Sequence, residues 1–275
     1  MSVDVEDWFC VHNLSRLIPY AEWDRCESRV ERSTELLLDL FGKHRVEATF
    51  FVLGWVADRY PDLVREIERR GHELATHGYS HQLLTNMRPE EFRVDLQQSL
   101  ASLARITSQE VRGFRAPSFS LTKRTLWAVD ILRESGIRYD SSVFPVAFHP
   151  DYGIPDADLR PHRLAEGVTE LPMGVAEVMG KRIPCSGGGY FRLYPYALSR
   201  ALIRRCNRQG RSVMFYLHPW EADPGQPRVT GLPWSKRFRH YNNLDKTVDR
   251  LERLLGDFTF TSARRLIADH GRIPA

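Results

Sequence analysis

Cysteine is scarce in this sequence. Only four of the 275 residues are cysteines, and no two of them stand in a C-x-x-C arrangement. So few thiols, so far apart, exclude the disulfide framework that stabilises many small secreted proteins. We therefore expect a reducing compartment. The four positions are Cys10, Cys26, Cys185 and Cys206.

Long apolar runs are absent as well. No stretch approaches the roughly 18 consecutive apolar residues of a membrane-spanning helix. The chain opens on a strand-like segment, residues 2–5, and not on a basic and then apolar leader. These features predict a protein without a transmembrane segment, located in the cytoplasm.

A strong charge of one sign is also missing. Lys and Arg number 39 against 35 Asp and Glu, and the basic residues are scattered apart from small clusters such as 236–240. This balance gives no indication of a nucleic acid partner. The sequence has no internal repeat or low-complexity linker, and 42% of its residues are hydrophobic. One large domain spanning residues 1–275 is the simplest organisation.

What the sequence does contain is a regular alternation of apolar strands and amphipathic helices. Because parallel strands are joined by helices, this alternation predicts an α/β fold, a parallel sheet or barrel of about seven or eight strands with its helices outside. The strands are expected at residues 2–5, 46–53, 72–75, 111–114, 136–142, 168–172, 212–217 and 258–261. The helices are expected at residues 33–42, 58–70, 89–106, 121–134, 194–207, 244–255 and 263–269.

Three carboxylates, Asp4, Glu6 and Asp7, stand where the first strand ends. Like charges this close repel and raise each other's pKa unless a cation lies among them, so the cluster indicates a metal site. On an extended segment Asp4 and Glu6 share one face while Asp7 begins to turn away, which favours the first two as the converging pair. A solvated acidic strand end is the alternative.

Two histidines, His77 and His81, follow the strand expected at residues 72–75. If the segment enters a helical turn, positions four residues apart share a helix face and both imidazoles can turn toward one point. This is a metal-ligand spacing, although two surface histidines near a turn would give the same pattern. The pair and the acidic cluster both fall at the carboxyl ends of strands, where a barrel places its working residues.

Other polar residues stand where later strands end: Arg115, Asp140 and His218. Each is a weak signal by itself. Most arginines are solvated, an aspartate at a strand end can cap a turn, and a histidine after an apolar strand is often a packed core residue. At a strand exit beside Trp220, however, His218 is well placed to donate a proton.

A glycine run at residues 187–189 precedes Tyr190. Such a run can hold phosphate, but this one lacks the Lys-Ser/Thr of a nucleotide-binding loop. A close approach of the backbone to a sugar or to a packing partner is the preferred interpretation.

Taken in order, these segments resemble the motif series of the polysaccharide deacetylases. The segments are Val3-Asp4-Val5-Glu6-Asp7, Thr76 to His81, Arg115-Ala116-Pro117, Asp140 and Phe215 to His218. Members of this family are metal-dependent carbohydrate esterases on a distorted (β/α) barrel, and the resemblance spans nearly the whole chain. Residues 187–192, 218–227 and 237–241 further resemble the branch associated with exosortase and exopolysaccharide gene clusters. Residues 222–275 would be a family-specific extension packed on the barrel.

The resemblance implies that His77 and His81 bind a divalent metal, most simply zinc, together with one carboxylate of the first strand. The family's commonest first motif has adjacent aspartates, of which the first is a base and the second a ligand. Here Val5 follows Asp4, so the ligand is Glu6 or Asp7 and both stay candidates. Asp4 would be the catalytic base.

The resemblance also implies the remaining roles. Arg115 would pair with Asp4 and keep it ionised, and His218 would protonate the departing amine. Asp140 is the candidate for the carboxylate that keeps His218 charged. The backbone N–H of Ser118 is the candidate for stabilising the developing oxyanion.

The substrate-facing residues complete this set. Leu217 would face the acetyl methyl group, and Trp220 and Tyr190 would either stack on sugar rings or be packed. The implied reaction removes N-acetyl groups from an amino-sugar polysaccharide or its lipid-linked or oligosaccharide precursor, in exopolysaccharide biosynthesis. Two alternatives are a cyclic amidase of the allantoinase-like type on the same barrel and a sugar-binding pseudoenzyme that has lost its metal.

Overall fold

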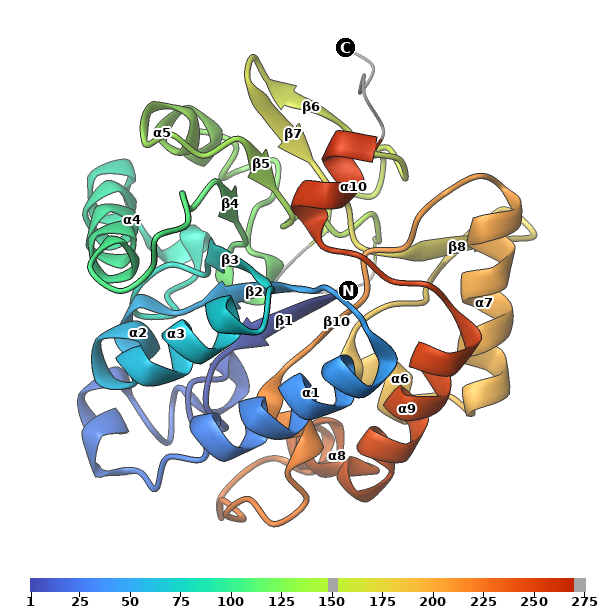
Figure 1. The fold of residues 1–275 in the computed structure, drawn as a ribbon, viewed down its shortest axis with the longest axis horizontal. Helices are drawn as coiled ribbons and strands as arrows, with labels where there is room; N and C mark the ends of the chain where they lie inside the picture. Colours follow the sequence, from blue (N-terminus) through green and yellow to red (C-terminus); the bar gives the residue numbers. More distant parts are fainter. Residues whose placement is uncertain (148–152, 270–275) are drawn as a thin grey trace.

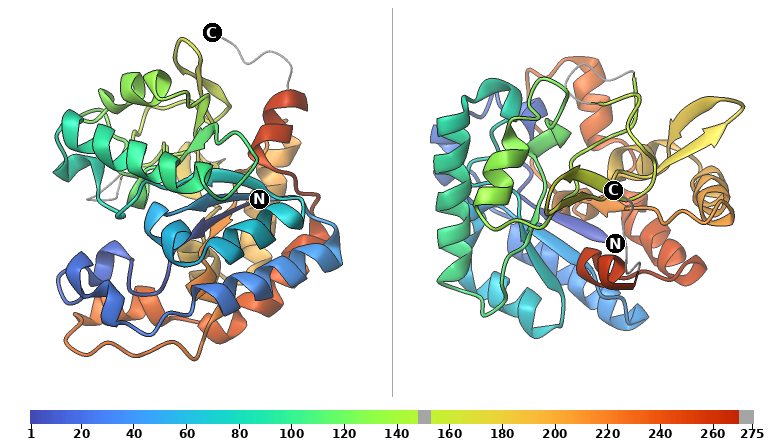
Figure 2. Two further views of the ribbon diagram at one scale, coloured as in Figure 1. Left: turned by 60° about the vertical axis from the view of Figure 1, so that its left-hand side comes forward. Right: turned by 90° about the horizontal axis from the view of Figure 1, so that it is seen from above.

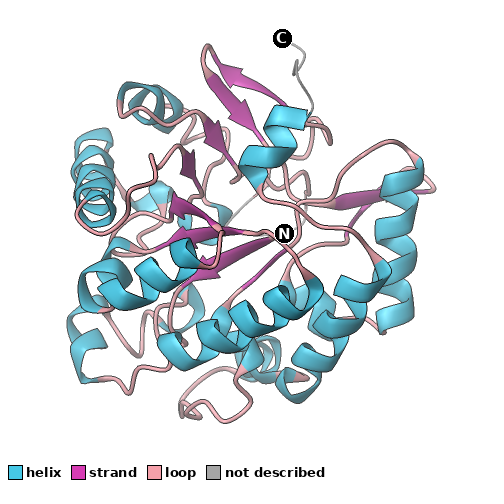
Figure 3. Ribbon diagram, in the orientation of Figure 1, coloured by secondary structure: helices cyan, strands magenta, loops and turns pink. Residues whose placement is uncertain are grey.

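A curled sheet forms the centre of the molecule and helices surround it (Figures 1 and 3). The computed structural model describes residues 1–147 and 153–269. Along the sheet the strands follow the order β10-β1-β2-β3-β4-β5-β7-β6, and every neighbouring pair is parallel except β6 with β7. The bounds are β1 Ser2–Val5, β2 Thr49–Val52, β3 Glu73–Thr76, β4 Gly113–Phe114, β5 Tyr139–Asp140, β6 His162–Ala165, β7 Val168–Glu170 and β10 Tyr216–Leu217.

One backbone bridge closes this sheet on itself. Met173, just after β7, pairs in parallel with Met214, just before β10, and the N–H of Gly174 donates to the carbonyl of Met214 at 3.4 Å. Within the described ranges the result is a distorted (β/α) barrel of seven parallel strands, with β6 lying outside as the antiparallel partner of β7. The predicted fold class is confirmed.

Helices cover the outside of this barrel (Figure 2). The amphipathic stripe predicted at residues 33–42 lies in α1, where Leu37, Leu38 and Phe41 are buried. The α-helices are α1 Val30–His44, α2 Gly54–Arg59, α3 Pro61–Arg69, α4 Pro89–Ala104, α5 Ala128–Glu134, α6 Gly188–Leu193, α7 Tyr196–Arg208, α8 Trp234–Tyr241, α9 Thr247–Asp257 and α10 Ala263–Asp269. The short 3-10 helices are His12–Leu14, Tyr20–Arg25, Leu84–Asn86, Pro117–Phe119, Pro219–Ala222 and Leu244–Lys246. In the part of the chain that the structure describes, no helix combines the length and the apolar character needed to cross a bilayer.

Several local predictions differ from the structure. The helix expected at residues 121–134 begins at residue 128, and β6, α6 and α8 were not predicted. The helix expected at residues 58–70 is two helices, because Pro61 starts α3 at a position where its missing N–H costs nothing. A hairpin of β8 Val175–Val178 and β9 Lys181–Pro184 was not predicted. The strand expected at residues 258–261 does not form.

The segment at residues 258–261 crosses the amino ends of the barrel strands instead. Its neighbours there, β1 and β2, already have strands on both sides, so no free edge is available. The segment is held by single contacts: the amino group of Met1 donates to the carbonyl of Thr261 at 2.9 Å. The side chains of Thr49 and Glu73 then accept the first N–H groups of α10 at 2.7 and 2.9 Å. These contacts close the amino end of the barrel.

Asp140 and Glu170 form a buried carboxyl pair on adjacent strands. They are register partners between β5 and β7, and both are fully buried. Ser142 donates twice to Asp140, and the N–H of Val143 donates to Glu170 at 3.0 Å. Burial and the Asp140 charge raise the pKa of Glu170 well above its usual value, so Glu170 is the protonated partner at neutral pH.

This pair predicts a specific dependence of stability on pH. A carboxyl group with a raised pKa in the folded state stabilises the fold fully below its ordinary pKa and loses that contribution as the pH rises through the folded value. Glu170→Gln mimics the protonated form. We expect the difference in the free energy of unfolding between this variant and the wild type to grow in favour of the variant by up to about 1.4 kcal/mol per pH unit above pH ~5. Denaturant unfolding from pH 5 to 9 measures this. Glu166→Gln, at an exposed neighbouring position, is the control; parallel curves for Glu170→Gln and wild type would contradict the assignment.

Candidate active site

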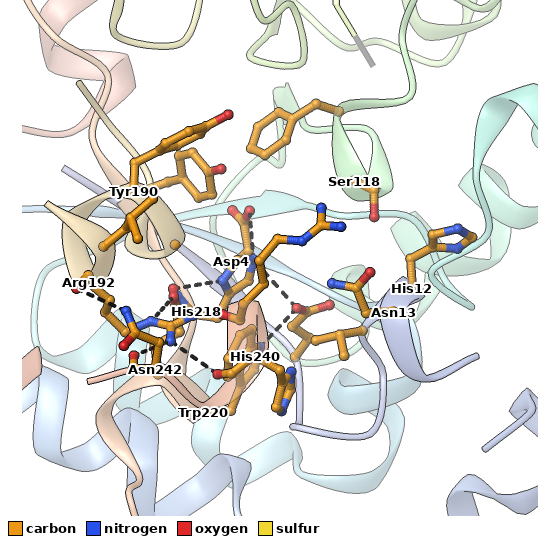
Figure 4. A pocket seen from close by; sticks show the side chains of 18 of the residues that line it. Asp4, His12, Asn13, Ser118, Tyr190, Arg192, His218, Trp220, His240 and Asn242 are labelled. Atoms are coloured by element: carbon orange, nitrogen blue, oxygen red, sulfur yellow. Dashed lines mark hydrogen bonds and ion pairs between the residues drawn. The ribbon is translucent and has the colours of Figure 1, made fainter. Parts of the chain in front are cut away.

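The carboxyl ends of four barrel strands, β1, β3, β4 and β10, meet at one pocket. Glu6 follows β1, His77 follows β3, Arg115 follows β4 and His218 follows β10, while Asp140 ends β5. Parallel strands end at the same edge of a sheet, so Glu6, His77 and His218 line one pocket although they are remote in the chain. Arg115 reaches it through Asp4, and Asp140 does not line it. The pocket holds about 270 Å³ and is shown in Figure 4.

Glu6, His77 and His81 form a buried cluster whose candidate ligand atoms all lie within 4.8 Å of one another. Glu6 Oε2 lies 2.9 Å from His81 Nε2, yet it accepts no hydrogen bond from any described residue. A buried carboxylate oxygen without a donor is costly unless a cation compensates it. One carboxylate and two imidazoles suit a divalent ion such as zinc and leave coordination positions open.

The protonation states in this cluster also suit a metal. Burial, and then the charge of His81, lower the pKa of His77 well below its usual value, so its imidazole is neutral. The Nδ1 of His77 lies 2.8 Å from the carbonyl of Arg115, which orients the ring as in other metal-binding histidines. Burial alone would raise the pKa of Glu6, but His81 and His218 lower it to about 2. Glu6 is therefore ionised.

The loop that carries the two histidines is held by Asp95 of α4. The Asp95 carboxylate accepts hydrogen bonds from the N–H groups of Tyr79 and Ser80 at 2.7 and 3.2 Å and from the Ser80 hydroxyl at 2.7 Å. Gly78 is required, because its φ is +74° and a Cβ there would lie 2.9 Å from the same carboxylate.

This loop corrects the predicted geometry of the pair. His77 and His81 do converge, but residues 77–81 form no helical turn, and His81 itself adopts a left-handed φ of 53°. Such strain at a non-glycine residue is typical of functional sites. Asp95 was not predicted, because in the sequence it is one of several polar residues on the solvent side of an ordinary amphipathic helix.

Asp7 points away from this cluster. Its Oδ2 accepts hydrogen bonds from the Ser28 hydroxyl and from the N–H groups of Arg29 and Val30 at 2.7 to 3.1 Å, and its Oδ1 accepts from the N–H of Trp8. These donors surround the first turn of α1, where backbone N–H groups have no partner within the helix. Of the two carboxylates that the sequence left as alternatives, Glu6 thus lies in the cluster and Asp7 does not.

A matched pair of variants tests this separation. We expect Glu6→Ala to weaken metal binding at least tenfold, because it removes a ligand. Asp7→Ala should keep the metal and lower the free energy of unfolding by about 1–3 kcal/mol, because it leaves the first turn of α1 without acceptors. Metal analysis of the purified proteins and denaturant unfolding measure the two effects. Loss of metal from Asp7→Ala with retention in Glu6→Ala would reverse the assignment.

Asp4 and Arg115 form a buried ion pair at the floor of the pocket. Arg115 Nη1 lies 2.5 Å from Asp4 Oδ1, and the same guanidinium donates to Ser2 and twice to Ser141. It lies 4.1 Å above the ring of Phe51. This arrangement holds one oxygen of Asp4 and leaves Oδ2 facing the pocket, 3.8 Å from His218 Nε2.

The carboxylate beside His218 belongs to Glu221, not to Asp140. Glu221 Oε2 accepts from His218 Nδ1 at 2.9 Å, and its Oε1 lies 2.8 Å from Arg192 Nε. Burial alone would lower the pKa of His218, but the carboxylates of Glu6 and Glu221 raise it to about 9. His218 is then an imidazolium at neutral pH, and its Nε2 lies 3.5 Å from Glu6 Oε1 and 3.8 Å from Asp4 Oδ2 at the pocket. The expectation for Asp140 is wrong because its carboxylate is engaged with Ser142 and Glu170, and it does not line the pocket.

The glycine run allows this contact. A Cβ on Gly188 would lie 1.9 Å from Glu221 Oε2, so only glycine lets the backbone of α6 approach the carboxylate. The run therefore acts as a packing site for a charged group. Arg192 and Glu221 both lie within the segments that resemble the exopolysaccharide-associated branch. Nothing in the sequence indicated that these two residues, so far apart in the chain, form an ion pair.

The residues expected to face substrate divide into two groups. Ser118, which adopts a left-handed φ of 50°, and Tyr190 line the pocket (Figure 4). Leu217 is 1% exposed and packs in the core, and Tyr216 takes its place at the pocket wall. The expectation for Leu217 is therefore wrong, because side chains alternate along a strand.

Trp220 lines the pocket but both faces of its ring are covered. His218 stacks on it at 5.2 Å and His240 at 4.5 Å, with interplanar angles of 19° and 8°. Its indole N–H donates to Glu6 Oε1 at 3.1 Å. Trp220 is thus a packed residue that orients Glu6 and His218, and it has no free face for a sugar ring.

Two family models match this chain. Residues 20–139 match the model described as polysaccharide deacetylase, and residues 141–268 match one described as a domain of unknown function (DUF3473). His77, His81 and Arg115 fall in the first region, and His218, Glu221 and Arg192 fall in the second. Asp4 and Glu6 precede both.

Similar proteins include two bacterial deacetylases. A peptidoglycan-N-acetylglucosamine deacetylase of Bacillus cereus is 28% identical over 39% of this chain and 44% of its own length. A chitooligosaccharide deacetylase of Rhizobium leguminosarum bv. trifolii is 29% identical over 35% of this chain and 51% of its own length. The match thus spans about half the length of these relatives.

A solved structure has the same fold. A candidate polysaccharide deacetylase from Mycobacterium smegmatis aligns with a TM-score of 0.62 and 20% identity over 98% of this chain and 88% of that one.

Proposed function

We propose that this chain, whose residues 20–139 match the polysaccharide deacetylase model, hydrolyses the N-acetyl groups of an amino-sugar oligosaccharide or polysaccharide with the help of a divalent metal. The observation that carries the proposal is the convergence of three units in one pocket. These are the Glu6–His77–His81 cluster, the Asp4–Arg115 pair and the His218–Glu221–Arg192 chain. Relatives whose names specify deacetylation of peptidoglycan and of chitooligosaccharides support it.

The chemistry of amide hydrolysis assigns the roles. A metal held by Glu6, His77 and His81 would supply Lewis acidity to water and to the acetyl carbonyl. Asp4 accepts the proton of the attacking water at Oδ2, since its Oδ1 is paired with Arg115. Arg115 fixes the direction of that oxygen and balances its charge.

His218 completes the reaction as the acid. Its Nδ1 is engaged by Glu221, so the proton passes from Nε2 to the departing amine, which could not otherwise leave at neutral pH. The N–H of Ser118, at the pocket wall, is our candidate for stabilising the negative charge on the carbonyl oxygen.

We further propose zinc as the metal and exopolysaccharide biosynthesis as the setting, with a polymer or a lipid-linked or oligosaccharide precursor as substrate. The resemblance of residues 187–192 and 218–227 to the exopolysaccharide-associated branch supports this setting. These segments also contain Arg192, Gly188 and Glu221, which together position His218.

Release of acetate from N-acetylated chitooligosaccharides by the zinc-loaded protein tests the activity. We expect this release, and we expect none from allantoin, whose cyclic ureide would require a different pocket. The opposite preference would indicate a cyclic amidase. Sugar binding without bound metal and without turnover on either substrate would indicate the sugar-binding pseudoenzyme.

Two histidine variants separate the metal site from the acid. We expect His77→Ala to lose both metal and acetate release, and His218→Ala to lose turnover by a factor of about 10²–10⁴ while keeping the metal. Metal content and acetate release, measured on the same preparations, decide this. Loss of metal from His218→Ala would show that His218 is a ligand and not the acid.

Replacement of the partner of His218 should change the pH profile. Because the Glu221 carboxylate raises the pKa of His218, Glu221→Gln lowers it, and the active imidazolium is then lost at a lower pH. At pH values between the lowered pKa of His218 in the variant and its pKa in the wild type, the ratio of the variant's kcat/KM to that of the wild type should fall about tenfold per pH unit. The exposed Glu177→Gln is the control. An unchanged alkaline limb in Glu221→Gln would contradict the role of this pair.

A further inference from the structure

The mouth of the pocket is continuous with an exposed aromatic surface on α8. Phe238 and Arg239 line the pocket, and Trp234 lies one helical turn before Phe238. Their side chains are unusually exposed for large apolar residues, at 78% for Trp234 and 42% for Phe238. The two ring planes are nearly parallel, with centroids 5.6 Å apart and an interplanar angle of 19°, so exposed aromatic surface continues from Phe238, which lines the pocket, to Trp234, which lies outside its lining.

The carboxyl end of α8 is fixed to the catalytic machinery. Arg192, which holds Glu221, also donates to the backbone carbonyls of Arg239, His240 and Asn242 at 2.7 to 3.1 Å (Figure 4). His240 is buried, and its Nε2 lies 2.8 Å from Gln226 Oε1. The aromatic surface therefore has a defined position relative to His218.

Arg239 is a charged residue of the pocket lining, and no carboxylate among the described residues pairs with it. Inside the pocket, Asp4 is paired with Arg115, Glu6 with His81, and Glu221 with Arg192. Arg239 is exposed, and its side chain has no ion-pair partner in the described ranges. A guanidinium in this state, at the edge of a pocket, is suited to bind a carboxylate or a phosphate group.

We infer that Trp234, Phe238 and Arg239 form an outer binding site for the saccharide chain whose acetamido sugar occupies the pocket. Sugar rings beyond the reacting one stack on the two aromatic rings, and Arg239 pairs with an acidic group next to the acetamido sugar. The occupant is the substrate itself, because the aromatic surface begins at residues that already line the pocket. The inference rests on the proposed deacetylase function and narrows its substrate to an anionic saccharide of several units.

Chain-length dependence tests the aromatic part. Acetate release and calorimetric binding are measured with N-acetylated chitobiose and chitohexaose for the zinc-loaded wild type, Trp234→Ala and Trp234→Phe. We expect Trp234→Ala to lower the hexamer-to-dimer ratio of kcat/KM about 3- to 10-fold, and Trp234→Phe to restore it. Met179→Ala removes another highly exposed apolar side chain, on the β8–β9 turn, and serves as the control. An unchanged ratio in Trp234→Ala would overturn this part.

Charge dependence tests the role of Arg239. The same assays compare neutral chitohexaose with a hyaluronan hexasaccharide, which carries carboxylates, and with farnesyl diphospho-N-acetylglucosamine, which carries phosphates. Arg239→Gln should lower the preference for one of the two anionic probes over the neutral one about 10- to 100-fold. The probe affected identifies the source of the acidic group. Arg237→Gln, an exposed neighbour outside the pocket lining, should not change it, and equal losses on neutral and anionic probes would overturn the charge assignment.

The remaining outcomes separate this site from the activity. Trp234-dependent binding of the hexasaccharides without acetate release would refute the deacetylase function and leave the outer site standing. Acetate release that is independent of Trp234 and Arg239 would do the reverse. Failure of the wild type to bind any oligosaccharide would overturn the inference. It would also be overturned if Trp234→Ala lost sedimentation with anionic phosphatidylglycerol vesicles while its sugar affinity stayed unchanged. That result would indicate that the aromatic residues bind a membrane surface.

Discussion

Three carboxylates are buried in one pocket, and each must have a positively charged or metal partner for the fold to tolerate it. Removing an ionised carboxylate from water costs several kcal/mol unless charge and hydrogen bonds compensate. Asp4 is compensated by Arg115, Glu221 by Arg192 and His218, and Glu6 by His81 with an oxygen left for a cation. Arg115 follows β4, His218 follows β10, His81 lies in the loop after β3, and Arg192 lies in α6. The pocket therefore depends on the whole barrel being assembled.

The same requirement explains why distant parts of the chain cooperate. The region that matches the polysaccharide deacetylase model contributes His77, His81 and Arg115, whereas His218 and its supports come from the region beyond residue 141. The first strand, between β10 and β2, carries Asp4 and Glu6 into contact with both. Neither region by itself contains a complete set of compensated charges.

Single packing interactions then set the chemistry of each group. Trp220 is stacked between two imidazoles and donates to Glu6, so one side chain orients both the candidate ligand and the candidate acid. Gly188 lets the backbone approach Glu221, and Asp95 holds the loop of His77 and His81. In each case a residue without chemistry of its own decides where a reactive atom points.

The sequence alone determined the strand and helix alternation, the barrel and the gathering of polar residues at strand ends, because periodicity and chain order are local properties. It also indicated the histidine pair, and the resemblance to the polysaccharide deacetylases implied the pairing of Asp4 with Arg115. It left Glu6 and Asp7 as alternatives, misassigned Asp140 and Leu217, and contained no sign of Glu221, Arg192 or Asp95 as supports. Those points depend on which side chains meet across elements, and on the direction in which a strand turns after its last paired residue. Only the closed barrel decides them, because burial forces every charge to find its partner in three dimensions and not along the chain.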